Sequence, residues 1–364
     1  FSFSEIIIQI TSIIGSYGLG AIVVSSFAGF YYVIFGNKRE RITFLLLVGI
    51  TWIIILYYGM DRLNNNPTSF SNIKLRLVQP SIEQSEKWTL ESFWINFNKH
   101  KELSLSNVDK FSPDLIIWSE SAVTVQPYYV QILNSLKNIT KRSGAILITG
   151  GISDNYSNPY RSSDKLFASI YAINQEGDIL FDYHKSHLVP FGEYVPLADF
   201  LPIKKLTPGA VPFSPGKAGF IVNLEKFNLK IRPLLCYEII FPDEVRTNNK
   251  EADLILNLTN DAYFGDNTGP YHHFYTSRMR AVENGLPLVR VANNGISSII
   301  DPVGRIIVKT ELNKVLYVDA FLPLKATNDT NFSKNANLMV YLFIIFTYIL
   351  IHVPRISLIL KHKS

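Results

Sequence analysis

Three uncharged apolar runs flank a long segment of mixed polar and apolar composition. Two runs, at about residues 6–35 and 42–60, lie within residues 5–60, and the third covers residues 336–353. Each run is long enough to cross the hydrocarbon core of a bilayer, which takes roughly 20 residues of helix. The pattern therefore predicts two transmembrane helices before a globular segment, residues 68–333, and one transmembrane helix after it.

The start of the chain also bears on the membrane prediction. The sequence begins with Phe1 and enters the first apolar run without the basic residues that open a secretory signal. We therefore expect a membrane helix there rather than a signal peptide. We also expect the chain to be a fragment or a processed product.

Basic residues lie beside the apolar runs on one predicted side of the membrane. Lysine and arginine concentrate in the short cytoplasmic loops of membrane proteins. Both basic flanks should therefore be cytoplasmic, which places residues 68–333 outside the cytoplasm. The residues concerned are Lys38, Arg39 and Arg41 after the first run, and Arg355, Lys361 and Lys363 after the third.

Short β-branched runs alternate with helical stretches in residues 68–333, which is typical of an α/β protein. A helix is expected at residues 130–144, where a glycine ends the apolar periodicity. A second helix is expected at residues 269–285, between Gly269-Pro270 and Gly285. The expected strands are residues 73–82, 114–121, 145–153, 166–174, 229–238, 252–260, 287–294 and 296–304.

Charge and cysteine content narrow the possible partners. The formal net charge is +5, and the basic flanks of the apolar runs account for part of it, so we expect no nucleic-acid partner. A single cysteine excludes an intrachain disulfide and a cysteine-rich zinc site. The histidines at 184, 187, 272 and 273 form no metal-binding motif with the acidic residues nearby. We expect no metal and no cofactor.

Three reactive side chains lie at or after predicted strands. Glu120 ends "LIIWSE", Cys236 ends "IRPLLC", and Lys185 lies in "FDYHKSHLVPFGEYVP". An ordinary thiol, with a pKa of about 8.5, is mostly protonated at neutral pH, so a nucleophilic cysteine needs a base or a nearby cation. Glu120 could be that base and Lys185 that cation. The alternatives are a packing role for the thiol, a helix cap and a surface ion pair.

The sequence motifs around these residues resemble those of a known family. "DLIIWSESAV", "YHKSHLVPFGEYVPL" and "LLCYEIIFPD" resemble the Glu–Lys–Cys triad motifs of the nitrilase superfamily. "VQPSIEQSEKW" and the segment that starts "LTNDAYFGDNTGPYHHF" are similar, more narrowly, to the bacterial apolipoprotein N-acyltransferases. The resemblance covers about residues 5–353. It implies a nitrilase-like α-β-β-α sandwich flanked by transmembrane helices.

The resemblance also implies a reaction and a location. The family is embedded in the bacterial cytoplasmic membrane, with its catalytic domain on the periplasmic side. Cys236 would take the sn-1 acyl chain of a phospholipid as a thioester and pass it to the α-amine of the N-terminal S-diacylglyceryl cysteine of a lipoprotein. Glu120 would act as general base and acid, and Lys185 would stabilise the oxyanion together with a backbone N–H near Tyr237. Supporting roles are implied for Glu193, Tyr237, Glu238 and Trp88.

The sequence departs from the family pattern in two ways, and two other functions stay open. The family has seven membrane helices before its catalytic domain, where this chain has two, and Ala168 stands where the family tends to have asparagine. A membrane-tethered nitrilase-type amidase would use the same triad with water as the second acceptor. An inactive remnant or interaction module is the other alternative.

Overall fold

The computed structural model describes residues 2–125, 129–154, 165–196, 212–246 and 252–336, together with Tyr341. The chain divides into two compact units. One comprises Phe1–Pro67, Val282–Gly285 and Thr327–Ser364, and the other comprises Thr68–Ala281 and Leu286–Ala326.

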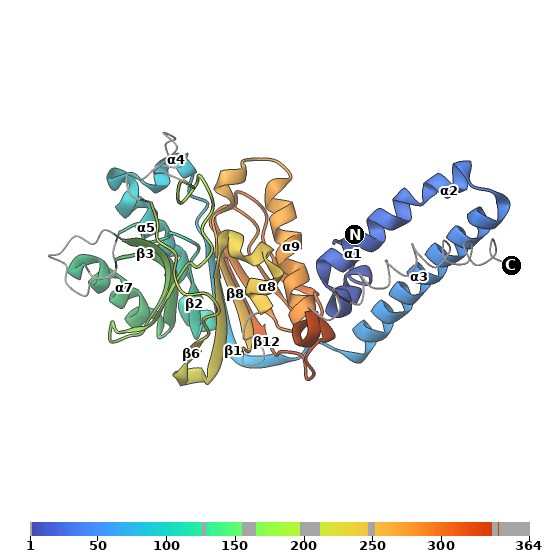
Figure 1. Ribbon diagram of the computed structural model, residues 1–364. Helices are drawn as coiled ribbons and strands as arrows, with labels where there is room; N and C mark the ends of the chain where they lie inside the picture. Colours follow the sequence, from blue (N-terminus) through green and yellow to red (C-terminus); the bar gives the residue numbers. More distant parts are fainter. Residues whose placement is uncertain are drawn as a thin grey trace. The chain divides into compact units, whose positions relative to one another are not determined.

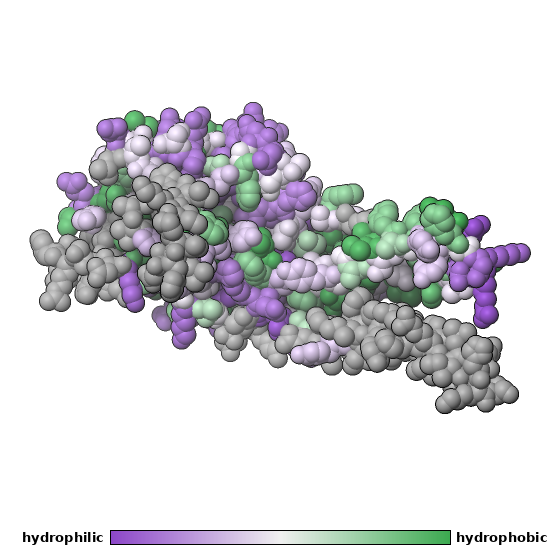
Figure 2. Space-filling model, turned by 45° about the horizontal axis from the view of Figure 1, so that its top comes forward, coloured by the Kyte–Doolittle hydropathy of each residue, from purple (hydrophilic) through white to green (hydrophobic). Residues whose placement is uncertain are grey.

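The first unit is built mainly from the N-terminal apolar segments. Its helices are η1 (Ile7–Ile10), α1 (Thr11–Ala28), α2 (Phe30–Phe35) and α3 (Lys38–Asn65). Two helical segments, Ile7–Phe35 and Lys38–Asn65, are long and apolar enough to cross a membrane. Figure 2 shows the hydrophobic side chains that these helices leave on the surface. The third predicted membrane helix, residues 336–353, lies outside the described residues except for Ala336 and Tyr341.

The second unit contains two six-stranded sheets. The first has the order β12-β1-β2-β3-β4-β5, in which β1, β2 and β3 are parallel. The second has the order β11-β10-β9-β8-β7-β6, in which β7, β8 and β9 are parallel. The strands of the first sheet are β1 (Phe70–Gln79), β2 (Leu115–Ile117), β3 (Ile146–Asp154), β4 (Leu166–Ile173), β5 (Ile179–His184) and β12 (Leu316–Pro323). Those of the second are β6 (Val222–Leu224), β7 (Leu229–Leu235), β8 (Leu254–Thr259), β9 (Leu288–Ala292), β10 (Ser298–Ile300) and β11 (Ile306–Lys309).

Helices cover the outer face of each sheet (Figure 1). On the first sheet lie α5 (Leu90–Leu105) and α7 (Val130–Ser143), and on the second lie α8 (Pro242–Arg246) and α9 (Gly269–Asn284). Between β1 and β2, the shorter helix α4 (Gln84–Lys87) precedes α5 in the sequence and the shorter helix α6 (Val108–Phe111) follows it. One buried apolar cluster fills the space between the two sheets, and two more fill the interfaces between sheet and helices.

This architecture confirms the predicted α-β-β-α sandwich. Central parallel strands are buried on both faces, so they appear in the sequence as short continuous apolar runs. The predicted helices at residues 130–144 and 269–285 correspond to α7 and α9. The edge strands β5, β6, β11 and β12 and helix α5 were not predicted.

Candidate active site

The fold holds Cys236 in an unusual backbone conformation at the end of β7. The residue begins the 3-10 helix η3 (Cys236–Ile240) and has a φ of +48°, in the left-handed region that non-glycine residues rarely adopt. Asn257, in the neighbouring strand β8, donates from Nδ2 to the Cys236 carbonyl oxygen at 3.3 Å. His273 Nε2 lies 3.2 Å from the same oxygen. These contacts hold the strained turn and keep the thiol at the carboxyl end of the sheet.

The thiol of Cys236 is neutral in the resting site. Thr259 donates its hydroxyl to Sγ at 3.2 Å. Burial, followed by the negative charge of Glu120, raises the pKa of Cys236 to about 12, although Lys185 opposes the shift. A thiol with this pKa becomes a nucleophile only if a base accepts its proton during the attack.

Glu120 is the candidate base for this thiol. It follows β2 at the carboxyl end of the first sheet, and it is 6% exposed. Burial raises the pKa of Glu120 above its ordinary value, and the Lys185 charge partly offsets this rise. A buried carboxylate with a raised pKa accepts a proton more readily than an exposed one.

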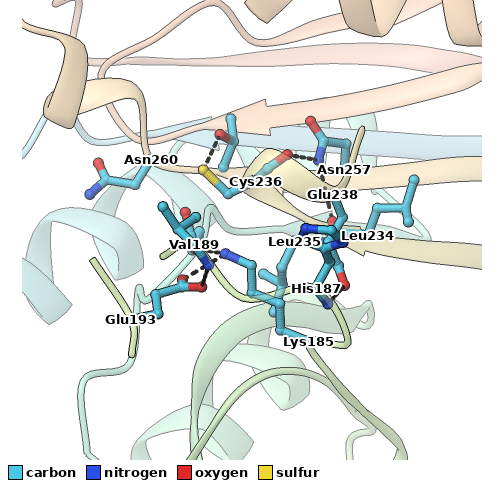
Figure 3. Close-up of polar contacts among 12 residues, drawn as sticks. Lys185, His187, Val189, Glu193, Leu234, Leu235, Cys236, Glu238, Asn257 and Asn260 are labelled. Atoms are coloured by element: carbon cyan, nitrogen blue, oxygen red, sulfur yellow. Dashed lines mark hydrogen bonds and ion pairs between the residues drawn. The ribbon is translucent and has the colours of Figure 1, made fainter. Parts of the chain in front are cut away.

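Lys185 follows β5 and is 1% exposed. Its Nζ lies 2.6 Å from Glu193 Oε1 and 3.9 Å from Glu120 Oε1. Burial alone would lower the pKa of Lys185, but the charges of Glu193 and Glu120 outweigh burial and raise it. Glu193 is itself held by the backbone N–H of Val189, at 2.8 Å. Lys185 is therefore a fixed positive charge in the site. In Figure 3 its side chain reaches toward the Glu193 carboxylate, below the Cys236 sulfur.

Glu238 supports the site from within the protein. Its carboxylate is fully buried and accepts hydrogen bonds from the Tyr183 hydroxyl at 2.8 Å and from the backbone N–H of Leu235 at 2.7 Å. It also accepts from the backbone N–H groups of Ser186 and His187. Glu238 thus ties the nucleophile turn to the segment that follows Lys185.

In the part of the chain that the structure describes, the other two predicted supporting residues, Tyr237 and Trp88, make no polar contact with the triad. Tyr237 directly follows the nucleophile, and its ring meets Phe241 edge-on with a centroid distance of 5.4 Å. Trp88 follows α4, and its indole nitrogen is buried without a hydrogen-bond partner among the described residues. The structure thus brings Glu120, Lys185, Glu193 and Cys236 together, with Glu238 behind them.

A buried polar network behind the nucleophile was not predicted. Asp261 accepts from Arg290 Nη2 at 2.8 Å and lies 2.8 Å from His273 Nδ1. Although burial opposes it, the Arg290 charge and the His273 contact lower the pKa of Asp261 to about 2. Thr259 ends β8 and Asp261 follows it, beside the parallel strand β7, which ends just before Cys236. This strand-end position was the available sequence signal. Among the described residues, no three acidic, histidine or cysteine side chains are placed to hold a metal ion.

Comparison with known proteins defines the class first. A carbon-nitrogen hydrolase family model matches residues 74–325, and the chain therefore belongs to the carbon-nitrogen hydrolase family. The crystal structure of Nit3 from Saccharomyces cerevisiae, a member of the nitrilase superfamily, is similar with a TM-score of 0.53 at 19% identity. This match covers 70% of this chain and 93% of Nit3, and it shows the shared fold.

Relatives of higher identity define the branch of the family. The chain is 51% identical over 353 residues to an apolipoprotein N-acyltransferase of Rickettsia bellii, with 96% of this chain and 69% of the relative covered. It is 49% identical over 354 residues to that of Rickettsia prowazekii, with 97% and 70% covered. The chain therefore belongs to the apolipoprotein N-acyltransferases, as its motifs predicted. It spans about 70% of the length of these relatives.

Proposed function

We propose that this protein transfers an acyl chain from the sn-1 position of a phospholipid to the α-amine of the N-terminal S-diacylglyceryl cysteine of a lipoprotein. The relatives' name supports a lipoprotein acceptor. The observation that carries the proposal is the convergence of a neutral buried thiol, a carboxyl of raised pKa and a fixed ammonium at one place. Together these groups suit acyl transfer through a thioester.

In the first half-reaction, Cys236 Sγ attacks the ester carbonyl carbon while Glu120 takes the thiol proton. The carbonyl electrons move to oxygen, and Lys185 stabilises that oxyanion together with a backbone N–H near Tyr237. Collapse of the intermediate breaks the bond to the glycerol oxygen. Glu120 returns its proton to this leaving oxygen, so that lysophospholipid departs and the acyl chain stays on Cys236.

The second half-reaction uses the same groups, but sulfur is now the leaving group. The acceptor amine attacks the thioester carbon and Glu120 takes a proton from the nitrogen. The carbon–sulfur bond then breaks, and the thiolate regains a proton from Glu120. The site thus returns to its resting state after forming an amide.

We further propose a multi-pass arrangement in the bacterial cytoplasmic membrane. Helices within residues 5–60 and at residues 336–353 would anchor the catalytic domain, residues 68–333, on the periplasmic side. The apolar segments Ile7–Phe35 and Lys38–Asn65 and the basic residues between them support this placement. An anchored domain keeps the thiol near the bilayer that holds the phospholipid donor.

Trapping of the thioester tests the proposed function. Purified protein incubated with phospholipid labelled in its sn-1 chain should form an acyl adduct that hydroxylamine removes. Addition of a diacylglyceryl peptide should then move the label to the peptide's α-amine. In Cys236→Ala, the rates of adduct formation and of transfer to the peptide should both fall by roughly 1,000-fold or more, because the variant lacks the nucleophile.

Three outcomes would contradict the proposal. Unchanged transfer by Cys236→Ala would exclude the thioester route. Release of the label only as free fatty acid would identify a hydrolase. Absence of any adduct on the wild-type protein would favour an inactive chain.

A further inference from the structure

Lys87 is a buried lysine beside the catalytic groups that the mechanism above does not use. It ends the short helix α4 and is 3% exposed. Its Nζ donates a hydrogen bond of 2.7 Å to the main-chain carbonyl oxygen of Glu120. A buried ammonium is costly unless it is paired, so its position against the general base calls for an explanation.

Two other titratable groups bear on Lys87. Burial lowers the pKa of Lys87 to about 8, and the negative charge of Glu120, after β2, opposes this shift. His100 of α5 faces it as well, and burial lowers the pKa of His100 to about 3, so that imidazole is neutral. Lys87 is thus protonated at neutral pH, and its main electrostatic partner is the Glu120 carboxylate.

The main chain at Glu120 is also confined by the neighbouring strand β3. A Cβ atom at Gly150, in β3, would lie 2.7 Å from Glu120 Cα and 2.7 Å from the Ser119 carbonyl oxygen. Gly150 donates its own backbone N–H to that oxygen at 3.2 Å. Strand β3 thus limits the movement of this backbone, and Lys87 holds the Glu120 carbonyl oxygen.

We propose that Lys87 is a positioning residue for Glu120, which fixes the main chain of the general base and favours the ionised form of its carboxylate. The inference rests on the proposed function, because it needs Glu120 to act as the base. Lys185 and Glu193 act on the same carboxylate with opposite signs, and Lys87 adds a second positive charge. Together with Lys185, this charge lowers the pH at which the base can still accept the thiol proton.

The test is the pH dependence of Cys236 acylation in a single turnover, with the full chain and labelled phospholipid. Lys87→Met removes both charge and hydrogen bond, Lys87→Gln removes the charge but keeps a donor, and Lys87→Arg keeps the charge. The exposed Lys110→Met is the matched control. Circular dichroism melting checks that each variant folds.

In Lys87→Met and Lys87→Gln, the acidic limb of the pH–rate profile for Cys236 acylation should move to higher pH by about one unit. This is the size of a typical pKa shift caused by a nearby charge. Lys87→Arg and Lys110→Met should keep the wild-type limb. An unchanged limb in a folded Lys87→Gln or Lys87→Met protein would overturn the inference, even if the rate fell at every pH. Failure of the wild-type protein to form the adduct would instead refute the proposed function.

Discussion

The neutral thiol of Cys236 determines what the other catalytic groups must do. Many reactive cysteines are activated by a lowered pKa, whereas burial and the Glu120 charge raise that of Cys236 to about 12. In the proposed mechanism, sulfur therefore loses its proton to Glu120 as it attacks. The acid limit of acylation should thus follow the pKa of Glu120, with activity falling as the pH drops through that raised value.

The sequence allowed Glu120, Lys185 and Cys236 to be proposed as catalytic candidates because each lies in a long motif, with Glu120 and Cys236 at the ends of predicted strands. It could not predict how far burial shifts their pKa values. Nor could it predict Lys87 or Asp261, whose partners are remote in the sequence and meet only in the folded protein.

A first prediction at the residue scale concerns Glu193→Gln. The Glu193 charge is one of the causes that raise the pKa of Glu120, and its carboxylate also binds Lys185 at 2.6 Å. Loss of that charge should lower the pKa of Glu120 and leave Lys185 less firmly held. The acid limb of Cys236 acylation should move to lower pH, with a reduced maximal rate, in a single-turnover profile.

The exposed Glu176→Gln is the control for this profile and should leave it unchanged. A limb that stays in place, or moves to higher pH, in Glu193→Gln would mean that Glu193 does not influence the base.

At the scale of elements, the carboxyl ends of the central strands assemble the site. β2 ends before Glu120, β7 ends before Cys236, and β8 ends before the Asn260–Asp261 turn. These strands were predictable because burial on both faces makes them continuously apolar. The edge strands β5 and β11 are only partly buried, so their sequences lack that signal.

The close approach of β3 to the Glu120 backbone leads to a prediction for Gly150→Ala. The new methyl group would lie 2.7 Å from backbone atoms, so the main chain at Glu120 must move. We expect a loss of about 1–3 kcal/mol in the free energy of unfolding. Acylation should fall by roughly 100-fold, because small displacements of a catalytic group are costly. Denaturant unfolding and single-turnover acylation measure the two effects.

Gly151→Ala is the matched control in the same strand. A Cβ atom there would meet its nearest neighbours at 3.1 Å, a distance that a small shift can relieve. Equal losses of acylation in both variants would show that the contact between Gly150 and Glu120 is not special.

At the scale of the whole molecule, one chain combines a nitrilase-type sandwich with apolar helices. The sandwich alone is shared with proteins such as Nit3, so the fold does not select the substrate. The apolar segments Ile7–Phe35 and Lys38–Asn65 are long and apolar enough to cross a membrane, which fits the proposed lipid donor. In the proposed arrangement, their orientation would decide which side of the membrane the thiol faces.

Thiol labelling tests that orientation directly, because the chain has a single cysteine. In a Cys236→Ala background, Asn134→Cys places one exposed thiol on α7, and Glu40→Cys places one next to the basic residues between the two helices. A membrane-impermeant maleimide should label Asn134→Cys in spheroplasts and should reach Glu40→Cys only after the membrane is opened. This result follows if Lys38, Arg39 and Arg41 keep their loop in the cytoplasm. The reverse labelling would place the catalytic domain in the cytoplasm, and equal labelling of both thiols in spheroplasts would contradict a membrane-spanning arrangement.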